Sequence, residues 1–228
     1  MTCYDATFSH NTTDNTVHTT PFSWPAKPEA VLLDLGNVVL DVDFRRAFIA
    51  WSTSSGLPEE RFHSSWAMDA PYQLHETGDL NFRQYVEHLS GLFEVRMSLE
   101  AWRQGWNAIF VDLLPEVMPL LTRLQTRMPL YAFTNTNPTH EAAWRRGYPE
   151  LKVFRHIFVS SRIGRRKPDV AAYHLVAHRI GHSPEDIWFL DDNRDNVLGA
   201  SAAGLQSFRI RTESDVVQIL NRLLEICP

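Results

Sequence analysis

Residues 30–40 read AVLLDLGNVVL, and this stretch decides the fold. Four apolar residues, Ala30 to Leu33, follow one another without interruption and stop at Asp34. This pattern is typical of a strand in a parallel sheet, where helices cover both faces and every side chain is buried. We therefore expect residues 30–33 to form a strand of such a sheet, with Asp34 at its carboxyl end.

Similar apolar runs recur after residue 115 and alternate with helical patterns. The runs are PLYAFT ending at Thr134, HIFVS ending at Ser160, DIWFL leading into Asp191-Asp192, and QSFRI. The helical segments between and after them are PEVMPLLTRLQTR, DVAAYHLVAHRIG, NVLGASAAG and DVVQILNRLLEI. Strands that alternate with helices over short linkers predict an α/β fold with a doubly wound parallel sheet.

Residues 44–110 show a different sequence pattern, in which amphipathic helical segments follow one another. The breaks between them carry turn residues, for example Gly56-Leu57-Pro58 and Asp69-Ala70-Pro71. This block has no strand signal, and we expect it to be an all-helical insert.

Composition limits the class of protein and its surroundings. The chain has 228 residues, of which 44% are hydrophobic, and a formal charge of −5, which gives no general attraction to nucleic acid. It has two cysteines, Cys3 and Cys227, as suits a reducing cytoplasm, and no uncharged stretch near the ~20 residues of a membrane span. The polar start has no signal-peptide pattern, and we expect residues 1–28 to be a disordered extension.

Polar residues end three of the predicted strands. They are Asp34, then Thr134-Asn135, and then Asp191-Asp192. In an open parallel sheet the carboxyl ends of the strands form one ligand crevice, so these groups should meet. The basic turn RIGRRKP, residues 162–168, would bring Lys167 to the same edge.

Such a set of residues suits phosphoryl transfer. Three neighbouring carboxylates repel one another unless a cation lies among them, and oxygen ligands without His or Cys favour Mg²⁺. A lysine, a hydroxyl and an amide can hold phosphate oxygens, and a carboxylate can attack phosphorus. The sequence contains no Walker loop, no Gly-x-Gly-x-x-Gly and no nucleophile elbow.

In their order and placement these motifs resemble those of the haloacid dehalogenase-like hydrolase superfamily. They are DLGNV at 34–38, Thr134-Asn135, Lys167-Pro168 and Asp191-Asp192, and the resemblance covers about residues 29–215. The sequences of these motifs are most similar to those of the branch that contains α-glucose-1-phosphate phosphatases; they read DLGNVVLDVDF, FTNTN, GRRKPD and FLDDNRDN.

The resemblance implies a Rossmann-like core over residues 29–43 and 111–228 and a helical cap over 44–110. It implies that Asp34 is the nucleophile and forms an aspartyl-phosphate. Mg²⁺ would be bound by Asp34, the carbonyl of Gly36 and Asp192, with Asp191 acting directly or through water. Thr134, Asn135 and Lys167 would bind the phosphoryl group, and Lys167 would also be catalytic, because it would neutralise charge on the transferring group. The substrate would be a small phosphorylated metabolite such as a hexose 1-phosphate.

One position departs from most phosphatases that this sequence resembles. They carry a second Asp two residues after the nucleophile, which protonates the leaving oxygen, and this chain has Gly36 there. General acid catalysis contributes ~10²–10⁴-fold. Two alternatives therefore stay open, a metabolite-binding protein without turnover and a metal-independent 2-haloacid dehalogenase.

Several other residues can be interpreted either as part of a functional site or as structural. Asp41 and Asp43 could supply the missing acid but fit a surface hairpin better, and Asp195 and Asn196 fit helix capping as well as a site role. His75, Glu76 and Trp106 could face a sugar from the cap but suit packing. The structural reading is also preferred for His140, His174, His178 and His182, and for Arg162, Arg165 and Arg166 as a solvated turn.

Overall fold

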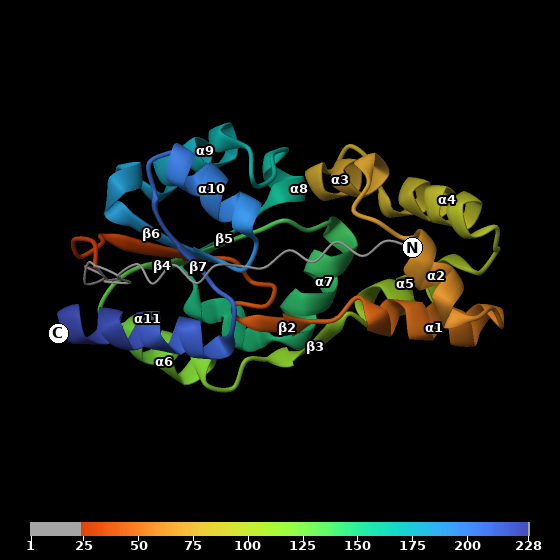
Figure 1. Ribbon diagram of the computed structural model, residues 1–228, viewed down its shortest axis with the longest axis horizontal. Helices are drawn as coiled ribbons and strands as arrows, with labels where there is room; N and C mark the ends of the chain where they lie inside the picture. Colours follow the sequence, from red (N-terminus) through yellow and green to blue (C-terminus); the bar gives the residue numbers. More distant parts are fainter. Residues whose placement is uncertain (1–23, 228) are drawn as a thin grey trace, which may run out of the picture.

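The computed structural model describes residues 24–227, and at its centre lies a five-stranded sheet whose strands all run parallel (Figure 1). Across the sheet the strands are β5 (His156–Val159), β4 (Leu130–Thr134), β1 (Ala30–Leu33), β6 (Ile187–Asp191) and β7 (Gln206–Arg209). Every residue of β1, β4 and β6 is buried. The predicted α/β class with a parallel, Rossmann-like sheet is confirmed.

Helices cover both faces of this sheet and explain the unbroken apolar runs. α6 (Val117–Leu124) and α11 (Glu213–Ile226) lie on one face, and α9 (Val170–Ile180) and α10 (Arg194–Ala202) lie on the other (Figure 1). Val31 and Leu33 pack into the apolar cluster of the first face, while Ala30 and Leu32 pack into that of the second. Successive side chains of a strand point to opposite faces, so all four must be apolar.

The chain winds in two directions from β1. It passes from β1 to β4 and β5 on one side, and then to β6 and β7 on the other. α7 (Pro138–Gly147), η1 (Pro149–Val153), α8 (Ser160–Ile163) and η2 (Pro184–Asp186) complete the connections. Because the strand order reverses at β1, a crevice opens at the carboxyl end of this strand.

Five helices follow β1 in the chain and precede the other strands of the sheet, and in space they lie together at one end of the molecule (Figure 1). They are α1 (Arg45–Ser55), α2 (Glu59–Ser65), α3 (Ala70–Thr77), α4 (Phe82–Phe93) and α5 (Leu99–Asn107). They share an apolar cluster that includes the buried rings of Trp51, Trp102 and Trp106. α1 and α5 approach closely at Gly105, where a Cβ would lie 2.2 Å from Nε1 of Trp51. We call these five helices the cap.

A short antiparallel ribbon joins the cap to the sheet, and the sequence did not predict it. β2 (Leu40–Val42) pairs with β3 (Phe110–Leu113) on either side of the five helices. These strands have three and four residues and carry Asp41 and Asp112, so they show neither a long apolar run nor a clear alternation. Phe110, placed in the helical insert from the sequence, is the first residue of β3.

The predicted N-terminal extension, residues 1–28, lies mostly outside the described residues, which start at Trp24. The Trp24 ring stacks on that of Trp188, with the centroids 5.8 Å apart, and Trp188 Nε1 donates to the carbonyl of Ala26. The start of the described chain therefore packs against β6. None of the helices in the described part has the length and apolar character needed to cross a membrane.

Candidate functional site

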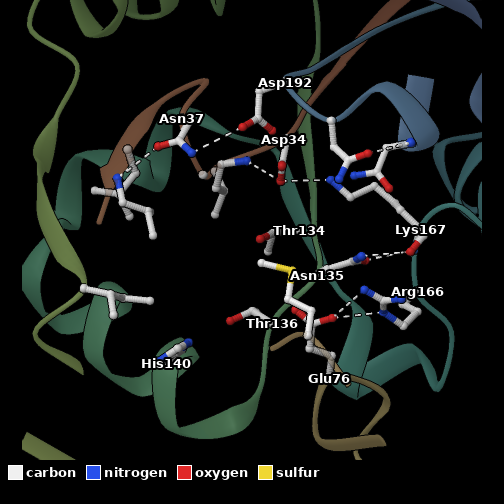
Figure 2. A pocket seen from close by; sticks show the side chains of 18 of the residues that line it. Asp34, Asn37, Glu76, Thr134, Asn135, Thr136, His140, Arg166, Lys167 and Asp192 are labelled. Atoms are coloured by element: carbon white, nitrogen blue, oxygen red, sulfur yellow. Dashed lines mark hydrogen bonds and ion pairs between the residues drawn. The ribbon is translucent and has the colours of Figure 1, made fainter. Parts of the chain in front are cut away.

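The carboxyl ends of three adjacent strands bring the predicted polar residues together (Figure 2). Asp34 follows β1, Thr134 is the last residue of β4, and Asp191 is the last residue of β6. β4 and β6 are the two neighbours of β1 in the sheet. Asp34 lies 100 positions from Thr134 and 157 from Asp191 in the chain, and the three meet at one edge because the parallel pairing aligns their strand ends.

Three carboxylates form the centre of the site. Asp34, Asp191 and Asp192 each offer an oxygen atom, and these atoms lie within 4.8 Å of one another. Nζ of Lys167 lies 2.9 Å from Oδ1 of Asp34 and 2.6 Å from Oδ2 of Asp191, and the lysine side chain is fully buried. Within this set, three carboxylates face a single ammonium group.

This crowding shifts the protonation of the cluster. Burial raises the pKa of Asp34 to about 7; the ammonium of Lys167 opposes this rise, and the charges of Asp191 and Asp192 add to it. Burial also raises the pKa of Asp192. For Lys167, burial works to lower the pKa, but the two carboxylates outweigh it and the pKa is raised. A further cation would favour the ionised carboxylates.

Asp191 holds the lysine rather than facing the cavity. Besides the ion pair with Lys167, its oxygens accept hydrogen bonds from Nδ2 of Asn196 at 3.0 and 3.1 Å and from the backbone N–H of Asn193 at 2.8 Å. Asp34 and Asp192 line the cavity at the site. Asn196, given two readings from the sequence, therefore orients Asp191, while Asn193 caps α10.

Asn37 is a site residue whose role the sequence did not predict. Its Nδ2 donates to Oδ2 of Asp192 at 3.2 Å, and its Oδ1 accepts from the backbone N–H of Val42. Its backbone is left-handed, with φ at 55°, a conformation that Asn tolerates better than most residues. Its place in the first motif, next to Gly36, was the available signal.

Thr134 and Asn135 differ in what their side chains can reach. Both residues line the cavity. The Asn135 side chain is also bonded to the backbone of Lys167: Nδ2 donates to the carbonyl oxygen at 2.9 Å, and Oδ1 accepts from the N–H at 2.8 Å. Asn135 therefore fixes the lysine segment against β4.

The cavity over this site has a volume of about 620 Å³ and is lined by both the core and the cap. The cap and its ribbon contribute Phe44, Met68, Tyr72, Glu76 and Phe110. Gly36 also lines it, and a Cβ there would have only Val42 Cγ2 nearby, at 3.7 Å. Asp41 and Asp43, considered as replacement acids, are not among the lining residues.

The histidines and arginines considered from the sequence differ in whether they reach the cavity, which His140 and Arg166 both line. Both ring nitrogens of His140 are bonded, to the Trp106 carbonyl and to Asn137, and burial lowers its pKa to about 3. His75 and Trp106 are buried and do not line the cavity. Of the three arginines, Arg162 pairs with Glu141 and Arg165 with Asp169, while Arg166 lines the cavity and pairs with Glu76.

The donor set fits a hard divalent cation. Its described ligand candidates are carboxylate oxygens on rigid strand ends, and the cluster carries more negative than positive charge. Asp34 is also a candidate nucleophile, because its side chain lines the cavity together with Thr134 and Lys167.

Comparison with known proteins gives the family. A model described as haloacid dehalogenase-like hydrolase matches residues 28–204. "Phosphatase MT3486" of Mycobacterium tuberculosis is 26% identical over 212 residues, covering 85% of this chain and 94% of that one. "Phosphorylated carbohydrates phosphatase" of Thermotoga maritima is 24% identical over 188 residues, covering 78% and 82%.

Other likenesses are partial or concern the fold alone. The chain spans 13% of "Drimenol cyclase drtB" of Aspergillus calidoustus (37% identical over 71 residues, 31% of this chain). It spans 39% of "Sesquiterpene phosphatase astK" of Aspergillus oryzae (34% over 76 residues, 33% of this chain). The HAD family enzyme bt-2542 of Bacteroides thetaiotaomicron, crystallised with magnesium and inorganic phosphate, superposes with a TM-score of 0.71 at 21% identity, covering 81% of this chain and 95% of that one.

Proposed function

The chain belongs to the haloacid dehalogenase-like hydrolases, and we propose that it is a Mg²⁺-dependent phosphatase of a small phosphorylated metabolite. The observation that carries the proposal is the placement of Asp34 at the end of β1, 2.9 Å from the buried ammonium of Lys167 and within the three-carboxylate cluster. The names of the Mycobacterium and Thermotoga relatives, each matched over most of its length, support a phosphatase.

In this proposal Asp34 is the nucleophile. One of its carboxylate oxygens forms a bond to phosphorus as the bond to the leaving oxygen breaks, which gives an aspartyl-phosphate and an alkoxide that takes a proton from water to become the free alcohol. Water then attacks phosphorus, and inorganic phosphate and the Asp34 carboxylate are released. Lys167, Thr134 and the backbone N–H of Asn135 hold the phosphoryl oxygens through both steps.

The same residues keep Asp34 reactive. Lys167 favours its ionised form, and Asp191, tied to Asn196, keeps the ammonium in place. Asp34, Asp192 and the Gly36 carbonyl would bind Mg²⁺, with Asp191 behind them. When bound, Mg²⁺ supplies positive charge that stabilises the ionised nucleophile and the negative charge of the transition state.

Gly36 leaves the leaving oxygen without an acid from this position. We propose that the substrate tolerates this because its leaving oxygen is less basic than an ordinary alkoxide, as for the anomeric oxygen of a hexose 1-phosphate. A sugar phosphate is also consistent with the name of the Thermotoga relative. The two cysteines of the chain fit a cytoplasmic location, which we propose as well.

A second candidate substrate is a phosphate ester of an apolar alcohol. The observation that favours it is the apolar part of the cavity wall, where Met68 is 52% exposed beside Phe44 and Phe110. A metal-independent dehalogenase reaction would leave the carboxylate cluster without a use. A binding protein without turnover would rest on Gly36 alone.

The test is a panel of phosphate esters with the purified protein, in Mg²⁺ and in EDTA. The panel contains hexose phosphates, a terpenyl phosphate and p-nitrophenyl phosphate, with Asp34→Asn as the matched variant. We expect Mg²⁺-dependent phosphate release that the variant loses. Halide release from a 2-haloacid in EDTA, or saturable binding without any turnover, would overturn the proposal in favour of the corresponding alternative.

A further inference from the structure

A largely buried ion pair lines the cavity and has no part in the proposed phosphoryl chemistry. Nε and Nη2 of Arg166 both lie 2.9 Å from Oε2 of Glu76, and the two side chains are 23% and 4% exposed. Removing such charges from water costs several kcal/mol per ion, and a buried pair is often no more stabilising than apolar residues of the same size. Stability alone is therefore a weak reason for this pair.

The pair joins the cap to the core at the site. Glu76 belongs to α3 of the cap, and its backbone carbonyl accepts a hydrogen bond of 2.7 Å from Oγ of Ser160, at the start of α8. Arg166 immediately precedes Lys167 of the proposed phosphate site. Glu76 and Arg166 both line the cavity, and Figure 2 shows them at its opposite end from Asn37 and Asp192, with Thr134 and Asn135 between.

This placement puts two complementary polar groups where the leaving group must lie. A phosphoryl group held by Asp34, Thr134 and Lys167 occupies the strand-end side of the cavity, so the rest of the substrate extends along the remaining wall. A carboxylate accepts hydrogen bonds from hydroxyl groups, and a guanidinium donates to them. Arg166 contacts only Oε2 of Glu76. The hydroxyl of Tyr72, which also lines the cavity, interacts with the same carboxylate, and each carboxylate oxygen has a second lone pair with which to accept a hydroxyl.

Resting on the proposed phosphatase function, we propose that Glu76 and Arg166 are specificity-determining residues that bind hydroxyl groups of a polyhydroxylated leaving group. Glu76 accepts from one hydroxyl, and Arg166, kept in place by Glu76, donates to another. The cap thereby contributes directly to the choice of alcohol, and the contact of α3 with α8 holds Glu76 at the substrate site. An apolar alcohol would exclude water from this ion pair without offering it any hydrogen bond in return, which is unfavourable.

Glu141 offers a matched control. It is as buried as Glu76, its carboxylate pairs with Arg162 at 2.6 Å and with Arg145 at 2.7 Å, and it does not line the cavity. Glu76→Gln and Glu141→Gln thus make the same change in two buried carboxylates that each pair with arginine. The first alters the cavity wall, and the second does not.

The test compares kcat/KM for a hexose phosphate with that for p-nitrophenyl phosphate, whose leaving group has no additional hydroxyl. We expect Glu76→Gln to lower the ratio of the two values by about 10- to 100-fold, as for loss of a hydrogen bond to a charged group, and Arg166→Gln to lower it similarly. Glu141→Gln should leave the ratio unchanged. Equal losses on both substrates in Glu76→Gln would reduce the pair to a structural contact and overturn the inference.

A second measurement does not depend on the folding of any variant. Free hexoses should inhibit hydrolysis of p-nitrophenyl phosphate by the wild-type protein competitively, and more strongly than apolar alcohols of similar size. Stronger inhibition by the apolar alcohols would contradict the inference while leaving the phosphatase proposal intact. If the wild-type protein hydrolyses no phosphate ester at all, the proposed function itself fails.

Discussion

Replacing Lys167 by Met should show how strongly the carboxylate cluster depends on one buried cation. The ammonium is fully buried and lies 2.9 Å from Asp34 and 2.6 Å from Asp191. Met fills much of the same volume but leaves these carboxylates without their counter-charge. Removing one partner of a buried ion pair costs about 3–5 kcal/mol of unfolding free energy, a large part of the ~5–15 kcal/mol that a native protein has.

The measurement is urea unfolding at neutral pH, in EDTA and in Mg²⁺. In EDTA we expect Lys167→Met to lose about 3–5 kcal/mol, and in Mg²⁺ less, because a bound cation restores positive charge to the cluster. Arg165→Met is the control, since Arg165 pairs with Asp169 on the surface and such pairs contribute about 0–1 kcal/mol. If both variants lost the same small amount in EDTA, the account of a charge-strained cluster would be refuted.

Three further predictions concern single positions. His140→Gln should remove a pH dependence of stability. Burial lowers the pKa of His140 to about 3, so between this pKa and the ordinary value of 6.5 only the unfolded chain binds a proton at this residue. The unfolding free energy of the wild-type protein should therefore fall by up to about 1.4 kcal/mol for each pH unit lost in this range, which unfolding curves at several pH values would measure. Gly199→Ala should cost about 1–3 kcal/mol and lower kcat, because its Cβ would lie 2.3 Å from the carbonyl oxygen of Pro168 and displace the lysine segment; thermal melts and steady-state kinetics test both effects, and an unchanged kcat would contradict the second. Gly36→Asp, which has room for a side chain, should increase hydrolysis most for esters with basic leaving oxygens; a uniform gain across a graded series would disprove the leaving-group explanation.

The sheet could be predicted because burial on both faces leaves a plain mark on a sequence. β1, β4 and β6 are fully buried and read as unbroken apolar runs, and the strand-end rule then placed Asp34 beside Asp191. The β2–β3 ribbon could not be predicted in this way. Its strands are short and partly exposed, so no periodic pattern distinguishes them from a loop.

The individual side-chain contacts of the site could be seen only in the structure. The sequence grouped Asn135 with the phosphate ligands, but whether its amide contacts a ligand or the backbone of Lys167 depends on side-chain geometry that spacing does not encode. The contact between Glu76 and Arg166 joins residues 90 positions apart on the cap and the core. No strand-end rule aligns them, because Glu76 lies on a helix outside the sheet.

In the proposed mechanism Asp34 becomes phosphorylated during turnover. To test this step, the protein is mixed with Mg²⁺ and a phosphate ester that it hydrolyses, the reaction is quenched in acid within one turnover, and the peptides are analysed by mass spectrometry. We expect a phosphoryl group on the peptide that contains Asp34, and we expect treatment with hydroxylamine to remove it. Phosphate release without any phosphorylated peptide, or with the phosphoryl group on a peptide that lacks Asp34, would contradict it.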